Sequence, residues 1–392
     1  MPKTVILGAA RTPIGKMGGG LSTLDATALG AAAIEAALER AQVAPEQVEH
    51  VVMGQVLQAG QGQIPSRQAQ IKAGIPKEVS SETINKVCAS GLRSCVILDQ
   101  AIRAGDVQVG VGGGMESMSQ APYLLPGARF GFRMGDVTAM DAMVHDGLTN
   151  PFSGKQMFVE ATEVGDELEL TRADLDRWAL RSHELALKAT DEGRLPEEIV
   201  PVTVPGRKGA DTVVEVDEGP RRDTTLEKLA ALPGLVGKEG SHTAGNSPGV
   251  NDAGGALVVS SDEWATANGR EALAEIVAHA QSANDFAYLA TTPASAAKKA
   301  LEKAGLQPGD IDVWEINEAF ASVTLNSIRM LGIDEDRVNV NGGAVALGHP
   351  IGASGARILG SIVFELRRRG GGLGCAAICS GGGQGDAVIL RV

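Results

Sequence analysis

The chain has 392 residues, of which 43% are hydrophobic and only 3% aromatic, and it carries a formal net charge of −13. The length predicts two or three packed units, and the composition predicts aliphatic cores. So acidic a chain, without a basic tract, is a poor candidate for binding nucleic acid or an anionic membrane. No apolar run reaches the roughly 18 residues that a membrane span requires.

Cysteine content and the first residues indicate the compartment. Four cysteines in 392 residues do not make a disulfide scaffold. The sequence begins Met-Pro-Lys-Thr-Val-Ile-Leu-Gly, which enters an apolar strand directly and lacks the charged region and cleavage site of a secretory signal. We therefore expect a cytoplasmic protein with free thiols.

The first predicted helix has a counterpart late in the chain. Residues 37–48 contain a helix end, a proline-marked turn and the approach to a strand, and residues 300–311 repeat them at an offset of 263. Residues 89–93 then match residues 353–357 at an offset of 264, and both segments open a helix that ends at a glycine. Matched elements in the same order indicate a gene duplication. Because each copy alternates strands and helices, we expect two α/β halves with a mainly parallel sheet.

The residues between the two copies, 120–249, match neither of them. They are rich in proline and glycine at first, and then contain one clear helix, with a capping box at residues 171–174 and Gly193 after its end. An inserted segment of this kind can shape a site at the junction of two halves. The expected division is an N-terminal half, an inserted loop domain and a C-terminal half: residues 1–119 plus 250–269, residues 120–249, and residues 270–392.

Cys88 is the first candidate for chemistry. It lies in the sequence Asn-Lys-Val-Cys-Ala-Ser-Gly, between an apolar strand-like run and a predicted helix. A thiol at a helix N-terminus meets the positive end of the helix dipole, which favours the nucleophilic thiolate. The alternative is a buried structural cysteine, because free cysteine is often part of a core. This motif alone leaves both interpretations open.

His349 is the candidate partner of that thiol. It lies in a glycine-rich segment directly before the helix that corresponds to the one after Cys88. If the halves pack with pseudo-two-fold symmetry, the two residues approach each other at the dyad, and His349 can take the thiol proton. A histidine in a turn is more often structural, but the symmetry argues for the catalytic interpretation.

Two more polar residues stand at strand ends. Cys379 ends a buried strand and enters a glycine loop, and Asn317 follows a strand of the second copy. Such an asparagine can orient a water, donate to an oxyanion or cap a helix. A zinc pair of Cys375 and Cys379 is discounted, because the cysteines show neither CxxC spacing nor a second ligand cluster, so no metal site is predicted. Cys95 and Cys375 are expected to be packing residues.

Together these segments resemble the thiolase family, which comprises acetyl-CoA C-acetyltransferases and 3-ketoacyl-CoA thiolases, over essentially the whole chain. The resemblance implies duplicated thiolase-like α/β halves in five layers, α-β-α-β-α, with an inserted loop domain. Six family hallmarks occur in family order, at residues 85–93, 113–119, 243–246, 317–320, 339–357 and 379–385.

The resemblance implies a role for each matching position. Cys88 would be the nucleophile that carries the acyl group, His349 would activate it, and Cys379 would be the acid/base at the α-carbon of the acetyl unit. Asn317, through a water, would form one oxyanion hole with His349, and the backbone N–H groups of Cys88 and Gly381 would form the other. The chemistry is consistent, because release of an enolate requires oxyanion donors and a proton source.

The resemblance also implies coenzyme A and acyl-CoA as substrates, with no permanently bound cofactor. Met157, Ser247 and Arg221 match substrate- or CoA-binding positions, and Arg221 would lie at the adenine-nucleotide end. The sequence departs from the family pattern at two of these places. Gln156 stands where many relatives have histidine, and Ser247 lies directly before a proline, where many relatives have the serine one position later.

The implied function is a reversible ping-pong Claisen condensation of two acetyl-CoA to acetoacetyl-CoA, or thiolysis of a 3-oxoacyl-CoA, through a Cys88 thioester. The alternatives are a longer-chain 3-ketoacyl-CoA thiolase of fatty-acid β-oxidation, a decarboxylating ketoacyl-synthase-type enzyme, which uses two histidines, and a non-catalytic CoA-binding homologue. The family and the long segment 124–148 further imply a homotetramer. The motifs specify neither chain length nor direction, and they leave a Cys88–Cys379 redox switch open.

Overall fold

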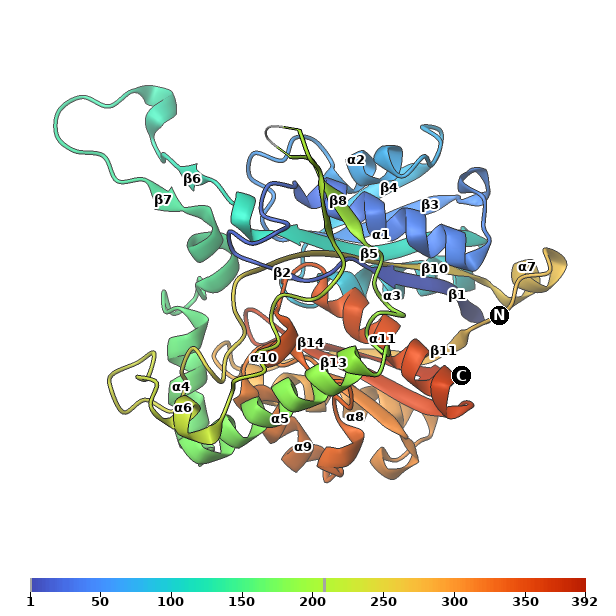
Figure 1. Cartoon of the computed structure of the whole chain (residues 1–392). Coiled ribbons are helices and arrows are strands. Elements are labelled where there is room, and N and C mark those ends of the chain that lie inside the picture. Colours follow the sequence, from blue (N-terminus) through green and yellow to red (C-terminus); the bar gives the residue numbers. More distant parts are fainter. Residues whose placement is uncertain (1, 207–208) are drawn as a thin grey trace.

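The computed structural model describes residues 2–206 and 209–392, and these residues form a ten-stranded mixed sheet (Figure 1). Across the sheet the strands follow the order β12-β13-β14-β11-β1-β10-β5-β3-β4, and β2 pairs with β10. The strands of this sheet are β1 (Thr4–Arg11), β2 (Gly15–Lys16), β3 (His50–Gly54), β4 (Ser80–Ile84), β5 (Val109–Ser117), β10 (Asn251–Ser261), β11 (Ala274–Ala283), β12 (Val313–Ile316), β13 (Leu373–Ser380) and β14 (Gln384–Arg391). Two small hairpins lie outside it, made of β6 (Tyr123–Leu124) with β7 (Met140–Asp141) and of β8 (Val202–Val204) with β9 (Thr212–Val214).

The helices belong to both halves and to the segment between them. The N-terminal half contributes α1 (Ala26–Ala41), α2 (Pro65–Lys72) and α3 (Ser90–Ala104). The segment between the halves contributes α4 (Met157–Glu167), α5 (Arg172–Asp191) and α6 (Leu226–Ala230). The remaining helices are α7 (Asp262–Ala267), α8 (Thr292–Ala304), α9 (Ala321–Leu331), α10 (Ala344–Leu347) and α11 (Ser354–Arg369).

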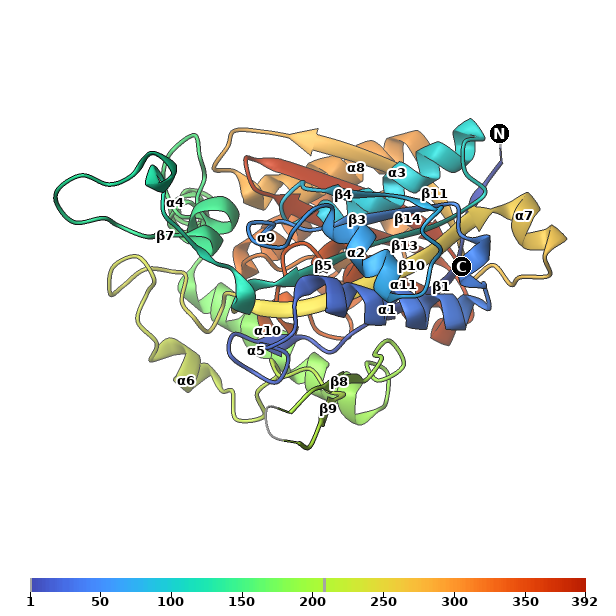
Figure 2. The same ribbon diagram turned by 90° about the horizontal axis from the view of Figure 1, so that it is seen from above.

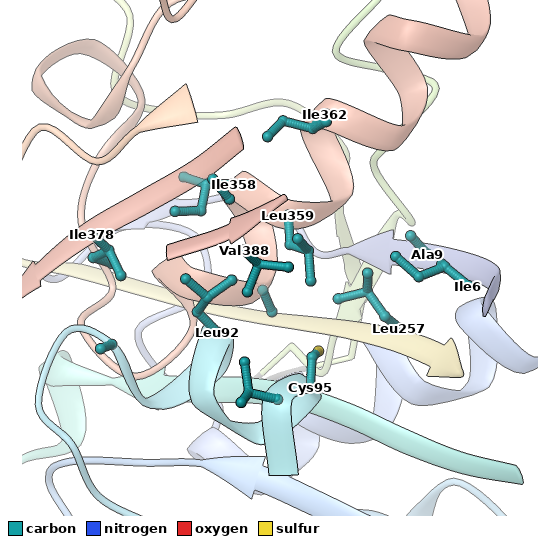
Figure 3. Packing of buried hydrophobic residues seen from close by; sticks show 14 of the residues in the cluster. Ile6, Ala9, Leu92, Cys95, Leu257, Ile358, Leu359, Ile362, Ile378 and Val388 are labelled. Carbon is teal, nitrogen blue, oxygen red and sulfur yellow. The ribbon is translucent and has the colours of Figure 1, made fainter. Parts of the chain in front are cut away.

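The elements form five layers, α-β-α-β-α, which confirms the predicted fold. In Figure 1, α1 and α2 cover the N-terminal strands, α3 and α11 lie between the two halves of the sheet, and α8 and α9 cover the C-terminal strands. Alternation along the strands fits these layers. In β13, Ala376 and Ile378 pack into the central cluster, whereas Cys375 and Ala377 pack into the outer cluster with α8 and α9. Figure 3 shows Ile378 in the central cluster, among side chains of α3 and α11.

The strand directions differ from the mainly parallel sheet that we expected. Among the described strands, parallel pairs occur only toward the two ends of the sheet, where β3 pairs with β4 and β5, and β12 with β13. The pairs between them are antiparallel. A tight turn joins β13 to β14, with φ of 75° at Gly382 and 69° at Gly383, so these two strands form a hairpin. Apolar runs predict that strands exist, but the connections decide in which direction each one returns.

The internal repeat appears as two copies of one unit. After α1, a 3-10 turn at Pro45–Gln47 leads into β3, and after α8 the turn Pro308–Asp310 leads into β12. The helices α3 and α11 also correspond, because each ends at a glycine in the left-handed conformation, Gly105 or Gly370. The prediction of two duplicated α/β halves is therefore confirmed.

The first turns of α3 and α11 touch each other at the centre of the molecule. A Cβ on Gly91 would lie 2.8 Å from a backbone nitrogen of α11, and a Cβ on Gly355 would lie 2.2 Å from a backbone nitrogen of α3. Both positions require glycine, because the two backbones approach too closely for a side chain. This contact sets the loop before α3 beside the loop before α11, and these are the loops that hold Cys88 and His349.

Part of the segment between the halves lies along one side of the molecule, where Figure 2 shows α5, α6, β8 and β9 together, whereas the β6–β7 hairpin and α4 lie at another edge. The helix α5 begins with the predicted capping box: the N–H of Asp174 donates to the Thr171 hydroxyl (3.2 Å), and the N–H of Thr171 donates to the Asp174 carboxylate (3.2 Å). Leu175 and Trp178 of α5 pack into the outer cluster of the C-terminal half. Throughout the described ranges, every helix is too short or too polar to cross a bilayer.

Candidate active site

A cavity of about 170 Å³ opens where the two halves and the inserted segment meet. Cys88 reaches it from the loop before α3, His349 from the loop before α11, and Cys379 from the end of β13. Two thiols and an imidazole therefore share one small space. Most of the remaining wall is apolar and includes Met118, Leu148, Met157, Phe158, Leu289, Phe320 and Ile351.

A strained turn presents Cys88 to this cavity. Val87 has a φ of 43°, in the left-handed region that a β-branched residue avoids. Local hydrogen bonds hold the turn in place. The Val87 N–H donates to the Asn85 side chain (2.9 Å), and the Ser90 hydroxyl donates to the Val87 carbonyl (2.6 Å) and accepts from the Lys86 N–H (2.8 Å). The strain is located at the residue directly before the nucleophile candidate.

The same turn is tied to the C-terminal half. The Lys86 ammonium forms an ion pair with Asp386 on β14 and donates to Gln281 on β11 (2.6 Å). The Ser380 hydroxyl, next to Cys379, donates to the Lys86 carbonyl. Burial raises the pKa of Asp386, while Lys86 opposes the rise. Because the side chain and the carbonyl of Lys86 reach β14 and the end of β13, the turn that carries Cys88 is held against the strand end that carries Cys379.

We expected the helix N-terminus to favour the thiolate of Cys88, and the structure corrects this expectation. Burial raises the pKa of Cys88 to about 12, against a smaller lowering by the backbone N–H groups of Cys88 and Gly381. Burial likewise raises the pKa of Cys379 well above its ordinary value, and the neighbouring Cys88 adds to the rise. Desolvation therefore outweighs the backbone N–H donors that surround the Cys88 sulfur. Both thiols are protonated near neutral pH, so attack requires a base.

His349 is arranged to act as that base. Its Nδ1 lies 2.6 Å from the Ser354 hydroxyl, which donates its only proton to the Pro350 carbonyl (2.9 Å). Ser354 must then accept from Nδ1–H, which leaves Nε2 without a proton. Nε2 is buried and has no partner among the described residues. Burial, with the charge of Arg357 as a lesser cause, lowers the pKa of His349 to about 3, so the imidazole is neutral.

Asn317 lies fully buried just after β12, and both polar atoms of its side-chain amide lack a partner among the described residues. Its backbone N–H donates to the Ala377 carbonyl (2.9 Å), which fixes it beside β13. The helix-cap alternative is wrong, because α9 has Phe320 as its N-cap. Buried amides are normally hydrogen-bonded, so Asn317 is suited to a water or a substrate oxygen. Its neighbours Ala319 and Phe320 line the cavity.

Two buried glutamates that the sequence did not single out hold the His349 loop in place. Glu116, on β5, accepts from the N–H groups of Val56 (3.0 Å), Leu57 (3.1 Å) and Gly352 (2.9 Å). Burial raises the pKa of Glu116 to about 7. The carboxylate thus joins the loop after β3 to the loop that carries His349. A sequence signal exists, since an acidic residue in an otherwise apolar strand needs a buried partner.

Glu318, next to Asn317, supports the same loop from the other side. Its carboxylate accepts from the Trp178 indole (2.9 Å), the Ser182 hydroxyl (2.9 Å), the Asn339 amide (2.9 Å) and the Val345 N–H (2.8 Å). It therefore connects α5 of the inserted segment with α10 in front of His349. A side chain at Gly343 would collide with it, because a Cβ there would lie 2.2 Å from its carboxylate.

The predicted substrate-binding residues are divided between two adjoining cavities. Met157 and Gln156 line the first cavity, and Ser247 lines the first and a second one of about 410 Å³. Arg221 lines only the second cavity. The Ser247 hydroxyl is buried without a partner among the described residues. A Cβ at Gly381 would lie 2.7 Å from the Met157 methyl group, so the main chain at Gly381 directly adjoins this wall.

The other two cysteines are placed in the core. Cys95 belongs to the central cluster and Cys375 to the outer cluster with α8 and α9, and both are fully buried. Burial raises the pKa of both thiols. Among the described residues, no three His, Cys, Asp or Glu side chains are grouped so that they could hold a metal ion.

Two free thiols and a neutral imidazole line one cavity at the junction of duplicated α/β halves. This arrangement is typical of a cysteine-dependent acyltransferase. The family model described as the N-terminal domain of thiolase matches residues 4–263, and that of the C-terminal thiolase domain matches residues 270–392. The chain belongs to the thiolase family.

Known proteins resemble this chain over its whole length. It is 47% identical to a probable acetyl-CoA acetyltransferase of Mycolicibacterium smegmatis, which covers 99% of this chain and 100% of the relative. It is also 47% identical to an acetyl-CoA acetyltransferase of Cupriavidus necator, with full coverage of both chains. The crystal structure of the Bacillus anthracis acetyl-CoA acetyltransferase superimposes with a TM-score of 0.97 at 39% identity, covering 100% of this chain and 99% of that one.

Proposed function

We propose that this thiolase catalyses the reversible condensation of two acetyl-CoA molecules to acetoacetyl-CoA, and the thiolysis of acetoacetyl-CoA in the opposite direction. The observation that carries the proposal is that Cys88, His349 and Cys379 line one buried cavity. The names of the relatives support acetyl-CoA as the substrate, since they are acetyl-CoA acetyltransferases of nearly the same length.

In the first half of the proposed reaction, Nε2 of His349 takes the proton of the Cys88 thiol. The sulfur attacks the thioester carbonyl of acetyl-CoA, and the C–S bond to coenzyme A breaks. The proton passes from His349 to the leaving thiolate, so that free coenzyme A and an acetylated Cys88 result. Backbone N–H groups of Cys88 and Gly381 stabilise the negative oxygen of the tetrahedral intermediate; the same groups lower the pKa of Cys88.

In the second half, Cys379 gives its proton to Nε2 of His349 and, as thiolate, removes an α-proton from the second acetyl-CoA. The resulting enolate attacks the acetyl group on Cys88, a C–C bond forms, and Cys88 leaves as a thiolate that recovers the proton held by His349. The protonated His349 and a water on Asn317 stabilise the enolate oxygen before that transfer. In thiolysis Cys379 acts as the acid instead. Support for the acid role comes from its pKa, which burial and the neighbouring Cys88 keep well above the ordinary value.

The alternatives fit the site less well. A decarboxylating condensing enzyme would use two histidines, but His349 is the one histidine on the described cavity wall. A non-catalytic CoA-binding homologue would not need two thiols and an imidazole around one cavity. A longer-chain 3-ketoacyl-CoA thiolase keeps the same machinery and differs in the acyl pocket, whose described volume of about 170 Å³ favours a short acyl group.

The proposed function predicts that the purified protein removes the magnesium–enolate absorbance of acetoacetyl-CoA only when coenzyme A is present. A series of 3-oxoacyl-CoAs of increasing chain length, measured as kcat/KM, then separates the two thiolase alternatives. We expect kcat/KM to be highest for the four-carbon substrate. A maximum at eight carbons or more would contradict the acetyl-CoA assignment in favour of the longer-chain enzyme, and no thiolysis of any member would contradict the thiolase activity.

We further propose a homotetramer in which the β6–β7 hairpin contacts another copy. Figure 1 shows this hairpin extending away from the body of the molecule. The hairpin exposes large apolar side chains to solvent in the single chain, with Phe130 at 91%, Met134 at 98% and Tyr123 at 67% exposure. Contact with another copy would bury them. Light scattering at micromolar concentration is expected to give about four times 40.3 kDa. A mass of 40.3 kDa would contradict the proposal, and a Phe130→Asp, Met134→Asp double variant should lower the measured mass.

The remaining features are proposals of the same kind. We propose residues 120–249 as an inserted domain between the two halves, for substrate binding and assembly. This division is supported by α5 of the segment, whose side chains donate to Glu318 and so hold the segment against the His349 loop. Coenzyme A and acyl-CoA would act as substrates, with no permanently bound cofactor. A cytoplasmic location is supported by four cysteines that are all free.

A further inference from the structure

The two backbone N–H groups that the proposed mechanism directs at the tetrahedral oxygen come from different halves of the chain. Cys88 lies in the turn before α3, and Gly381 lies in the turn between β13 and β14. Burial raises the pKa of the Cys88 thiol, and the N–H groups of Cys88 and Gly381 both oppose that rise, so the two donors face the same sulfur. Donors from two separate segments stabilise an oxyanion only if the segments are fixed against each other.

A side-chain hydrogen bond joins the two segments directly beside these donors. The Ser380 hydroxyl donates to the Lys86 carbonyl. Ser380 directly precedes Gly381, and Lys86 stands two positions before Cys88. Ser380 is fully buried, so solvent does not compete for this bond. The side chain of Val87 packs against the same place, because a Cβ on Gly381 would lie 3.3 Å from both Val87 methyl groups.

The ammonium group of Lys86 anchors the same turn on two strands of the C-terminal half. It forms an ion pair with Asp386 on β14 and donates to Gln281 on β11 (2.6 Å). Gln281 and Asp386 stand opposite each other where β11 pairs with β14. The Lys86 side chain is only 15% accessible and that of Asp386 only 1% accessible. The carbonyl and the side chain of one residue therefore bind the Cys88 turn to three neighbouring strands.

Asp386 is an exception on its face of β14. The same face presents Val388 and Leu390, which pack into the central apolar cluster. A carboxylate at this place loses its hydration, and burial raises the pKa of Asp386, with Lys86 as the largest influence in the opposite direction. A buried ion pair adds little to stability compared with apolar residues of the same volume. The pair is thus better explained by a need to hold the Lys86 turn than by a need of the fold.

We propose that Ser380 and Lys86 are positioning residues, which fix the two backbone donors on one point and so assemble the oxyanion hole across the two halves. This inference rests on the proposed function, in which that hole stabilises the tetrahedral oxygen during acetyl transfer. His349 reaches the Cys88 thiol by a separate route, because the contact between the first turns of α3 and α11 sets their loops side by side. Removal of the thiol proton therefore does not require Ser380, whereas stabilisation of the oxyanion does.

The test compares two reactions of Cys88 in the wild type and in Ser380→Ala, which removes one hydroxyl and leaves both backbone donors in the chain. Acetylation by acetyl-CoA passes through an oxyanion. Alkylation by iodoacetamide displaces iodide, requires only the thiol and its base, and develops no oxyanion. Rapid quenching and peptide mapping follow each modification on Cys88.

For Ser380→Ala, the rate constant of acetylation at saturating acetyl-CoA should fall about tenfold, which is less than the ~10²–10³-fold loss on outright removal of a donor. The alkylation rate and the half-saturating concentration of acetyl-CoA should both stay within about twofold of the wild type, because the thiol, its base and the binding surface are intact. An equal fall in alkylation would assign Ser380 a general structural role, and unchanged acetylation would show that the bond positions nothing. Either result would overturn the proposal.

Further variants test whether both contacts act through one turn. Lys86→Met should reproduce the selective loss of acetylation, and Lys86→Arg should restore most of it. The double variant Ser380→Ala, Lys86→Met should lose less than the product of the single losses, since both substitutions release the same turn. The matched control is Ser282→Ala, which removes another buried hydroxyl that donates to a carbonyl, that of Thr292 (2.8 Å), away from the cavity wall. It should leave both reactions unchanged.

A reagent without coenzyme A separates this inference from the proposed function. The neutral ester p-nitrophenyl acetate transfers its acetyl group to a thiol through the same kind of oxyanion and releases p-nitrophenolate. If the wild type rejected acetyl-CoA, the proposed function would fail, but a selective loss of ester-dependent acetylation in Ser380→Ala would still support the positioning role. Acetylation of both proteins by the ester at equal rates would refute that role, and a wild type that neither reagent acetylates on Cys88 would refute both proposals.

Discussion

Replacing Cys88 with serine is expected to abolish acetyl labelling and turnover together. Incubation of the wild type with acetyl-CoA should place one acetyl group on one thiol, and peptide mapping should find it on Cys88. The serine hydroxyl is a far weaker acid than the thiol, so neutral His349 cannot convert it to a useful nucleophile. The loss of kcat should be on the order of 10⁴-fold or more, as for other enzymes that lose their nucleophile.

The matched control is Cys95→Ala, which removes another buried thiol from the same helix region. Cys95 packs into the central cluster and does not line the cavity. Its removal should cost stability, by roughly 1 kcal/mol for a small buried side chain, and should leave labelling intact. A label found on Cys95 or Cys375 in the wild type would show that Cys88 is not the nucleophile.

The duplicated fold could be predicted because its signals are local. The proline turns after the two matched helices and the paired Ala-Ser-Gly motifs recur at a nearly constant offset. The structure shows the reason for the second signal, since Gly91 and Gly355 stand where α3 and α11 leave no room for a Cβ. Strand direction could not be predicted in this way, because it depends on where each connection returns and not on the residues of the strand.

The residues that line the cavity could also be predicted from the sequence, but their protonation states could not. The position of Cys88 near a helix N-terminus suggested a thiolate, whereas its burial raises the pKa to about 12. Burial is a property of the assembled halves and the inserted segment, so no local pattern reports it. The supporting roles of Glu116 and Glu318 were not predicted, for the same reason: their hydrogen-bond partners come from loops and helices that are distant in sequence.

A consequence of two high thiol pKa values is that the proton must move within the cavity. The neutral imidazole of His349, with its pKa lowered to about 3, can hold a proton only briefly, first from Cys88 while the thioester forms and later from Cys379 while the α-proton is removed. The arrangement therefore assigns the two thiols to different steps, and their removal should have different effects.

Cys379→Ser tests this division. The substitution keeps the size of the side chain, so the hairpin turn after β13 and the Ser380 contact to Lys86 should persist. The hydroxyl has a pKa far above that of a thiol, so the α-proton loses its acceptor and its donor. Acetyl labelling of Cys88 should remain near the wild-type level, because attack requires only Cys88 and His349. Thiolysis of acetoacetyl-CoA should fall by at least ~10²–10⁴-fold, the usual contribution of a general acid–base group.

Both quantities are to be measured on one preparation of Cys379→Ser, beside Cys375→Ala as the control. Cys375 lies on the same strand, but it packs into the outer cluster, away from the cavity. That variant should keep both labelling and thiolysis. Near-normal thiolysis by Cys379→Ser would remove Cys379 from the mechanism and leave the glycine turn as a donor of backbone N–H groups only. Loss of labelling as well as thiolysis would show that Cys379 is needed already for attack by Cys88, and the two-step division would be wrong.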